Sequence, residues 1–109
     1  MSRNSSLSDS VLGRRLRERR EALGWSQERA GVAVGLEVSN ARARISRYEL
    51  GVHEPAMPVV RQLAEALGVP LIYLYCEDDD LAGLLLKLHE LNATERRKAV
   101  HQFIRVVDA

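Results

Sequence analysis

Apolar residues recur three and four positions apart along most of the chain, a spacing typical of amphipathic helices. In the first half the pattern predicts three helices, one from Ser8 or Ser10 to Leu23 and two over about 26–34 and 40–50. No stretch of this part alternates as a strand would, once the apolar residues of 40–50 are placed on one helical face. We therefore expect an all-α fold.

The residues at the ends of these stretches suit helix termini. Ser26 is the expected N-cap of the second helix, and Ser39 or Asn40 that of the third, because a short polar side chain accepts a hydrogen bond from a free backbone N–H. Pro58 and Pro70 start a fourth helix and a short fifth one. Glycine follows four of these stretches, where a left-handed conformation ends a helix.

The C-terminal part carries two further apolar stripes. The first consists of Leu81, Leu84, Leu85, Leu88 and Leu91, and the second of Val100, Phe103, Ile104 and Val107. With Thr94 as the N-cap of the second helix and a connection of two or three residues, they predict an antiparallel helical hairpin. The hairpin either packs back on the preceding domain or self-associates, and Leu86, off the main stripe, favours self-association.

Length and composition limit the organisation to one domain, or to one domain with an appendage. The chain has 109 residues and 46% of them are apolar. We expect a disordered, Ser-rich tail at 1–9, a helical domain at 10–76 and the hairpin at 77–109. A single cysteine excludes an internal disulfide, and neither a membrane-length apolar run nor a signal segment is visible, so we expect a cytoplasmic protein that does not bind membranes.

The charge is unevenly distributed, although the formal net charge is only +1. Residues 10–75 contain ten arginines and seven acidic residues. Arginine suits planar hydrogen bonding to phosphates and to guanine edges, so the surplus favours nucleic acid as a partner. A salt-bridged surface is the alternative, and charge alone does not decide between the two.

The third predicted helix would present cations on its outer face. Its inward sector consists of Ala41, Ile45 and Tyr48. The opposite face carries Ala43, Ser46, Arg47 and Leu50, with Arg42 and Arg44 on the two flanks. A long cation among small neighbours can enter a groove closely, so this face predicts a DNA-reading surface.

The stretches WSQERAGVAVG and RISRYELGVHEP resemble the Xre or Cro type of helix-turn-helix regulator, the lambda-repressor-like domain, over about 11–75. LAEALGVPLIYL matches its fourth and fifth helices. The resemblance implies a five-helix lambda-repressor-like domain, followed here by the two-helix hairpin. Between Gly35 and Ile45 this chain has about four extra residues, which either lengthen the turn or add to the front of the third helix.

The resemblance also implies roles for individual residues. The expected base contacts are Arg42, Ala43, Ser46 and Arg47, and the expected phosphate contacts are Ser26, Gln27, Arg44 and His53. For Arg47 the alternatives are a phosphate contact and a solvated position. Arg20 and Glu49 resemble a structural ion pair between the first and third helices. We expect the other arginines of the first helix to be mostly solvated, with Arg14 or Arg15 attracting DNA at long range.

An enzyme is not expected. Cys76 precedes four acidic residues, whose negative field disfavours a thiolate nucleophile. The three histidines, His53, His89 and His101, lack metal-binding spacing, and no cofactor motif is visible, so no metal and no cofactor are expected. The competing interpretation is a protein-interaction module, such as the antitoxin-like partner of another protein, but outward arginines at 42 and 47 favour DNA.

The sequence therefore predicts a sequence-specific, double-stranded DNA-binding transcriptional regulator, a repressor of bacterial or phage type that is associated with the nucleoid. One recognition helix reads only a few base pairs, so a homodimer on an inverted-repeat operator is expected. The expected dimer interface consists of Leu84, Leu85, Leu88, Phe103, Ile104 and Val107, leaving Arg96, Arg97 and Lys98 in water.

Overall fold

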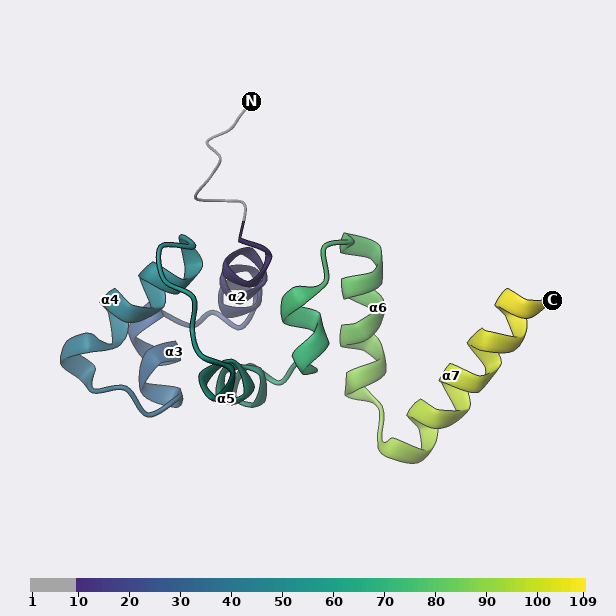
Figure 1. Cartoon of the computed structure of the whole chain (residues 1–109). Helices are drawn as coiled ribbons and strands as arrows, with labels where there is room; N and C mark the ends of the chain where they lie inside the picture. Colours follow the sequence, from purple (N-terminus) through teal and green to yellow (C-terminus); the bar gives the residue numbers. More distant parts are fainter. Residues whose placement is uncertain (1–9) are drawn as a thin grey trace, which may run out of the picture.

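The computed structural model describes residues 10–109, and within that range every regular element is a helix (Figure 1). The elements are α2 (Val11–Ala22), α3 (Gln27–Ala33), α4 (Val38–Glu49), α5 (Met57–Leu67), the 3-10 helix η1 (Leu71–Tyr75), α6 (Asp79–Glu90) and α7 (Ala93–Asp108). The all-α prediction is confirmed, whereas the tail predicted at 1–9 lies outside the described residues. None of these helices is both long and apolar enough to span a bilayer.

Short polar side chains begin the first two helices. Ser10 Oγ accepts a hydrogen bond from Gly13 N at 2.9 Å, and Ser26 Oγ accepts one from Arg29 N at 3.0 Å. Gly35, in the turn between α3 and α4, has a φ of 89°. The turn is tight, because Leu36 N bonds back to Gly31 O at 3.0 Å.

The start of α4 differs from the prediction. Its N-cap is Glu37, which makes no side-chain capping bond, so neither Ser39 nor Asn40 caps the helix. The backbone N–H of Asn40 bonds to Glu37 O at 2.9 Å, as expected of the first turn. The extra residues before Ile45 therefore extend α4 at its front and leave the turn short.

The core lies where α2, α4 and α5 meet around η1. Its fully buried large side chains are Leu16, Ile45, Val60, Leu63, Leu67 and Leu74. Two glycines let helices approach closely: a Cβ at Gly31 would lie 2.6 Å from Ala41 Cβ, and one at Gly13 would lie 2.7 Å from Tyr48 O. α4 is thus held tightly between α2 and α3, and its inward side is fixed.

α6 packs on the helix-turn-helix core, and α7 does not. Ala82 is buried, and Leu85 and Leu86 lie against the core cluster. This differs from the sequence interpretation, in which Leu86 favoured self-association and Leu85 belonged to a dimer interface. Asp78 caps α6 by accepting a bond from Leu81 N at 2.8 Å.

α7 leaves α6 as the second arm of an open V (Figure 1), and none of its residues is buried. Asn92, not Thr94, caps it, with Oδ1 accepting from Glu95 N at 2.9 Å. Arg96 donates to Leu88 O and Leu91 O, both at 2.8 Å, and to His89 O at 3.2 Å. Arg96 was expected in water. It instead donates to the last carbonyls of α6, which have no partners within the helix.

Candidate nucleic-acid interface

The outer face of α4 brings together all the residues expected to read bases. Ala41 and Ile45 are inaccessible on the inner side. Arg42, Ala43 and Arg47 are exposed on the outer side, and Ser46 is half-buried. A shallow hollow is lined by Gln27, Arg42, Ala43, Ser46 and Arg47. The start of α3 and the face of α4 therefore form one continuous surface.

Gln27 is attached to α4 through its side chain. Its Nε2 donates to Glu49 Oε1 at 3.0 Å, and the side chain is half-buried. The amide group retains a second N–H, which an amide nitrogen carries in addition to the one bonded. Gln27 thus lies at the first turn of α3, where the helix dipole favours an anion, with its orientation set by Glu49.

Glu49 also bonds Arg20, which joins α2 to α4. Arg20 Nε donates to Glu49 Oε2 at 2.6 Å, and its Nη2 donates to Oε1 at 3.2 Å. Arg20 Nη1 donates to Trp25 O at 2.8 Å. The hydrogen bond that Arg20 donates to Glu49 raises the pKa of Arg20, so this guanidinium stays charged. The Glu49 side chain is only 4% exposed, which leaves this carboxylate dependent on its donors.

The arginines of α4 and those of α2 have different surroundings. Within residues 10–109 no ion pair involves Arg42, Arg44 or Arg47. The ion-paired arginines of the same range are Arg14, Arg15, Arg17 and Arg20, all in α2. The cations of α4 are therefore available to an external anion.

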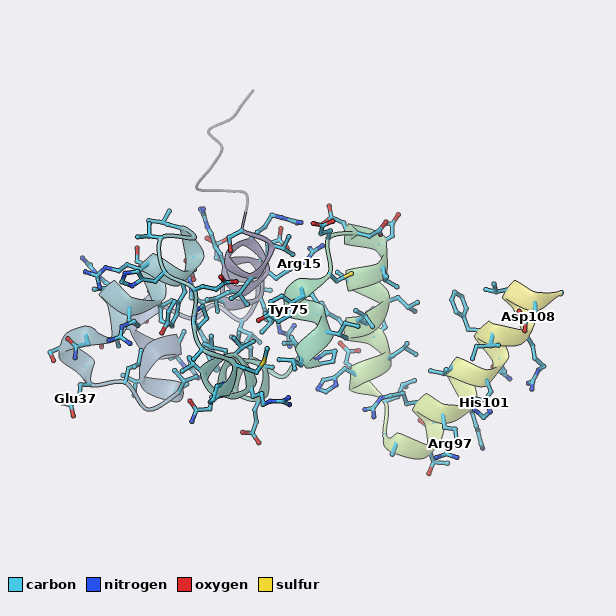
Figure 2. All side chains as sticks on the ribbon, viewed as in Figure 1. Arg15, Glu37, Tyr75, Arg97, His101 and Asp108 are labelled. Carbon is cyan, nitrogen blue, oxygen red and sulfur yellow. The ribbon has the colours of Figure 1, made fainter. Side chains whose placement is uncertain are left out.

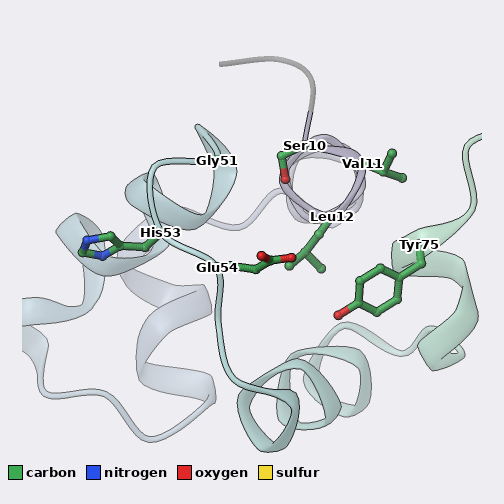
Figure 3. Close-up of a pocket in the computed structure, with 7 residues that line it drawn as sticks. All are labelled: Ser10, Val11, Leu12, Gly51, His53, Glu54 and Tyr75. Atoms are coloured by element: carbon green, nitrogen blue, oxygen red, sulfur yellow. The ribbon is translucent and has the colours of Figure 1, made fainter. Parts of the chain in front are cut away.

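Arg44 and His53 border the interface on the side of the loop after α4. Together with Arg47 they line a second hollow, which also includes Glu54 and Pro55. Figure 3 shows another hollow, between the start of α2, this loop and Tyr75. His53 points away from its centre, whereas Glu54 points into it, so a carboxylate and no arginine lines that space. His53 thus belongs with the α4 side.

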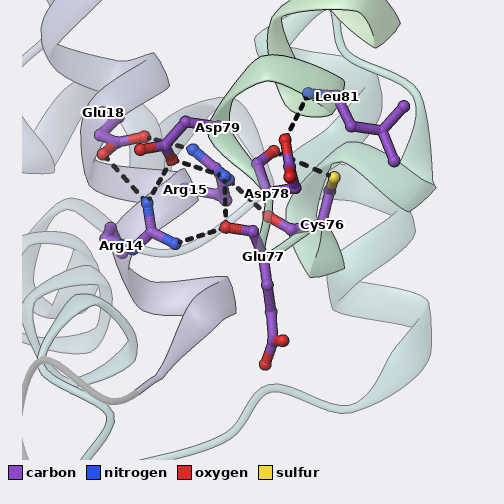
Figure 4. Close-up of polar contacts among 8 residues, drawn as sticks. All are labelled: Arg14, Arg15, Glu18, Cys76, Glu77, Asp78, Asp79 and Leu81. Atoms are coloured by element: carbon purple, nitrogen blue, oxygen red, sulfur yellow. Dashed lines mark hydrogen bonds and ion pairs between the residues drawn. The ribbon is translucent and has the colours of Figure 1, made fainter.

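Arg15 is buried and Arg14 is partly exposed but ion-paired, which corrects the sequence interpretation of both as mostly solvated (Figure 4). Arg15 is 3% exposed; its Nε donates to Cys76 O at 2.8 Å and its Nη2 to Asp79 Oδ1 at 2.9 Å. Arg14 Nη1 donates to the same Asp79 oxygen at 3.0 Å. These bonds, first that of Arg14 and then that of Arg15, lower the pKa of Asp79. Arg15 follows Leu12 by three positions, so it falls on the apolar face of α2, a signal that could have revealed its burial.

One further cation near the interface was missed. The Arg29 guanidinium lies 4.6 Å from the centroid of the Trp25 ring, within cation–π range. Arg29 is exposed on α3, two positions after Gln27. The four-residue spacing of Trp25 and Arg29, across the start of a helix, is the sequence signal for this contact. In the described residues no three His, Cys, Asp or Glu side chains are placed to hold a metal ion.

Comparisons with known proteins agree with this geometry. The sequence matches the family model of the helix-turn-helix domain over residues 11–72. Among solved structures it is similar to the crystal structure of the transcriptional regulator BswR, with a TM-score of 0.77 and 42% sequence identity, over 85% of this chain and 91% of that one. No curated protein matched the sequence. Because the family model covers more than half of the chain, from α2 into η1, the chain belongs to the helix-turn-helix domain family.

Proposed function

We propose that the protein is a sequence-specific, double-stranded DNA-binding transcriptional regulator of the Xre or Cro type that acts as a repressor. The observation that carries the proposal is the outer face of α4, where Arg42, Ala43, Ser46 and Arg47 are accessible together and the arginines have no acidic partner within residues 10–109. A helix of this kind fits the major groove of B-DNA. The likeness to a transcriptional regulator supports the same function.

In this proposal α4 reads the bases. Arg47 donates two parallel hydrogen bonds to a guanine, the commonest specific contact of an arginine with DNA. Ala43 and Ser46 are short, so the backbone of α4 can approach the base edges, where Ala43 contacts a thymine methyl group. Arg42 lies about one and a half turns nearer the front of α4 than Arg47 and reads a neighbouring base pair.

The start of α3 and the far flank of α4 hold the phosphate backbone. Ser26 and Gln27 lie at the N-terminus of α3, where the first backbone N–H groups lack helical partners and Gln27 keeps a second amide N–H. Arg44 and His53 contact phosphates on the other side of the recognition helix. Contacts of this kind fix the position of the protein without selecting a sequence.

A homodimer supplies the second recognition helix. The DNA-binding part corresponds to residues 10–76 and the dimerisation part to 77–109. The operator is then an inverted repeat whose half-sites lie about 34 Å apart, one turn of DNA. The exposed apolar side chains of α7 support a role for this helix in assembly.

The test is selection of bound sequences from random duplexes, followed by fluorescence anisotropy with the recovered site at several salt concentrations. We expect an inverted repeat and a steep loss of affinity with salt, at a slope of about −0.9 per phosphate contact. In vitro transcription from a promoter that contains the site should fall when protein is added. Recovery of no common sequence, with weak binding to every duplex, would exclude the proposed function.

A further inference from the structure

α6 and α7 diverge from a fixed connection and leave a space between them. Arg96 makes three hydrogen bonds, to Leu88 O, His89 O and Leu91 O, so it holds the beginning of α7 against the end of α6. From there the arms of the V separate, and α7 extends away from the helix-turn-helix domain (Figure 1). The open angle is therefore built into the chain by a specific contact.

The apolar surface of α7 is wider than one neighbouring helix requires. At 3.6 residues per turn, its apolar side chains cover an arc of roughly 160°, whereas a stripe of about 100° suffices to cover one face. The most exposed of them are Phe103 (53%), Ile104 (50%), Val106 (70%) and Val107 (69%). Such an arc fits a helix that lies between two others.

α6 presents a second apolar surface to the same space. Ala82 points to the core; at 3.6 residues per turn Leu84 and Leu88 fall on the side of α6 that faces away from it, and Leu81 falls about a quarter turn to one side. Leu81 is 49% exposed, and Leu84 and Leu88 are partly exposed. Both arms of the V thus carry apolar side chains that the chain itself leaves uncovered.

We propose that α7 of a second copy of this chain lies in the V between α6 and α7, and that the exchange is reciprocal. The result is an intertwined four-helix bundle, in which α7 of each copy contacts both α6 and α7 of the other. This inference rests on the proposed homodimer and specifies how it is built.

Area favours exchange over a simple contact between two α7 helices. A contact between two single α7 helices would cover only one stripe of about 100° on each, so part of the roughly 160° apolar arc and the leucines of α6 would stay in water. Seating α7 between two helices of the partner covers its whole apolar arc and the α6 stripe at the same time.

Charge fixes the direction of the exchanged helix. Arg97, His101 and Asp108 share one side of α7 (Figure 2), and at 3.6 residues per turn Arg97 and Asp108 fall next to Ile104 at the edge of the apolar arc, where they flank a helix that packs on the arc. In an antiparallel pair of α7 helices, Arg97 of each copy faces Asp108 of the other, whereas a parallel pair would place like charges together. The antiparallel arrangement also makes α7 of one copy run parallel to α6 of the other.

The test uses disulfide crosslinking without DNA, in a Cys76→Ala background that removes the native thiol. Chains with Leu84→Cys are mixed with chains with Val107→Cys and oxidised with copper phenanthroline, so every disulfide between the two kinds of chain joins two molecules. Exchange predicts an efficient crosslink, because Val107 of one copy lies beside Leu84 of the other. The control is Gly83→Cys, one position along on another side of α6 and in open space, which should crosslink weakly.

Other occupants of the V give different results. A dimer that crosslinks Val100→Cys to Val107→Cys but not Leu84→Cys to Val107→Cys would pair through α7 alone and would overturn the exchange. If the parent protein sediments as a monomer at high micromolar concentration, the V does not bind a second copy of this chain. That result would also overturn the exchange. Neither outcome touches the proposal that α4 binds DNA, because no duplex is present, whereas a monomer would overturn the proposed homodimer as well.

A second variant tests the role assigned to Arg96. Arg96→Ala removes the bonds that set the angle of the V, so the dimer dissociation constant should rise by about tenfold or more. Lys98→Ala, an exposed cation on the same helix, should leave it unchanged. If Arg96→Ala and the parent had equal dimer dissociation constants, exchange would not depend on the angle that Arg96 sets.

Discussion

The Arg15 guanidinium lies 2.9 Å from Asp79 Oδ1, and this bond ties the first helix of the helix-turn-helix domain to the first turn of α6. Arg15 also donates to Cys76 O and Glu77 O, so one buried guanidinium bonds the backbone carbonyls of the segment that joins η1 to α6. α6 is thereby fixed to the DNA-binding domain, and the V that it forms with α7 has a fixed position relative to α4. Any dimer built on the V would set the spacing of two recognition helices through this contact.

The first prediction concerns pH. The pKa of Asp79 is lowered in the folded protein, chiefly by the hydrogen bonds from Arg14 and Arg15, so its ionised form stabilises the fold. That stability is fully present above the ordinary aspartate value of 3.8 and is lost as the pH falls through the lower, folded value. Asp79→Asn should therefore have a lower melting temperature than the parent at pH 7. The difference between the two melting temperatures should become smaller in acid. Thermal unfolding from neutral pH to about pH 2.5 measures both curves, and parallel curves would contradict the assignment.

The second prediction separates the ion pair from recognition. Glu49→Ala should destabilise the fold by about 2–4 kcal/mol, because Arg20 and Gln27 both lose their acceptor in a nearly buried place. Arg44→Ala, exposed on the same helix, should change stability by less than about 0.5 kcal/mol. Urea unfolding of the two variants and the parent gives the comparison. Similar midpoints for Glu49→Ala and the parent would remove the proposed link between α2 and α4.

The third prediction concerns sequence choice. Arg47→Ala should cost about 1–3 kcal/mol on the preferred duplex and relax selection at one base pair. Gln27→Ala should weaken binding to all duplexes about equally, because a phosphate contact carries no sequence information. Selection from random duplexes with each variant distinguishes the two roles. A uniform loss of affinity in Arg47→Ala, with the recovered sequence unchanged, would assign Arg47 to the backbone instead.

The fourth prediction concerns the close contact of α3 and α4. A methyl group at Gly31 would lie 2.6 Å from Ala41 Cβ, so Gly31→Ala should push the helices apart and destabilise the protein by about 1–3 kcal/mol. Gly83→Ala meets open space in α6 and should instead stabilise by about 0.5–1 kcal/mol. Thermal unfolding should therefore show a lower melting temperature than the parent for Gly31→Ala and a higher one for Gly83→Ala.

The sequence predicts helices and their buried faces well, because one apolar period fixes both. Ile45 and Tyr48 fall inward and Arg47 outward on the period alone, and the structure has the same arrangement. The front of α4 was misplaced, since Ser39 and Asn40 suit a cap by type, whereas the tight turn at Gly35 lets the helix begin earlier, after Glu37. Where this helix begins is thus set by the preceding turn and not by which residue types suit an N-cap.

Long cations were the other source of error. Arg15 and Arg96 were expected in water, yet both end on backbone carbonyls at the ends of helices. A periodic pattern gives the direction in which a side chain leaves its helix, but not what its guanidinium reaches several bonds later. The sequence likewise predicts an antiparallel hairpin at 77–109, whereas α6 and α7 diverge from the connection that the bonds of Arg96 fix (Figure 1).

The last prediction concerns a chain that ends after Leu91. It keeps Ala82, Leu85 and Leu86 on the core and the bond between Arg15 and Asp79, and it removes only α7, which has no buried residue. The shortened protein should therefore unfold within a few degrees of the parent. It should sediment as a monomer and bind an inverted-repeat duplex far more weakly, because two linked recognition helices gain from the high effective concentration of the second one. Its affinity for a single half-site should stay close to that of one parent domain, since α4 is unchanged. A shortened protein that remains dimeric at micromolar concentration would place the interface within α2 to α6, and α7 would then need a different partner.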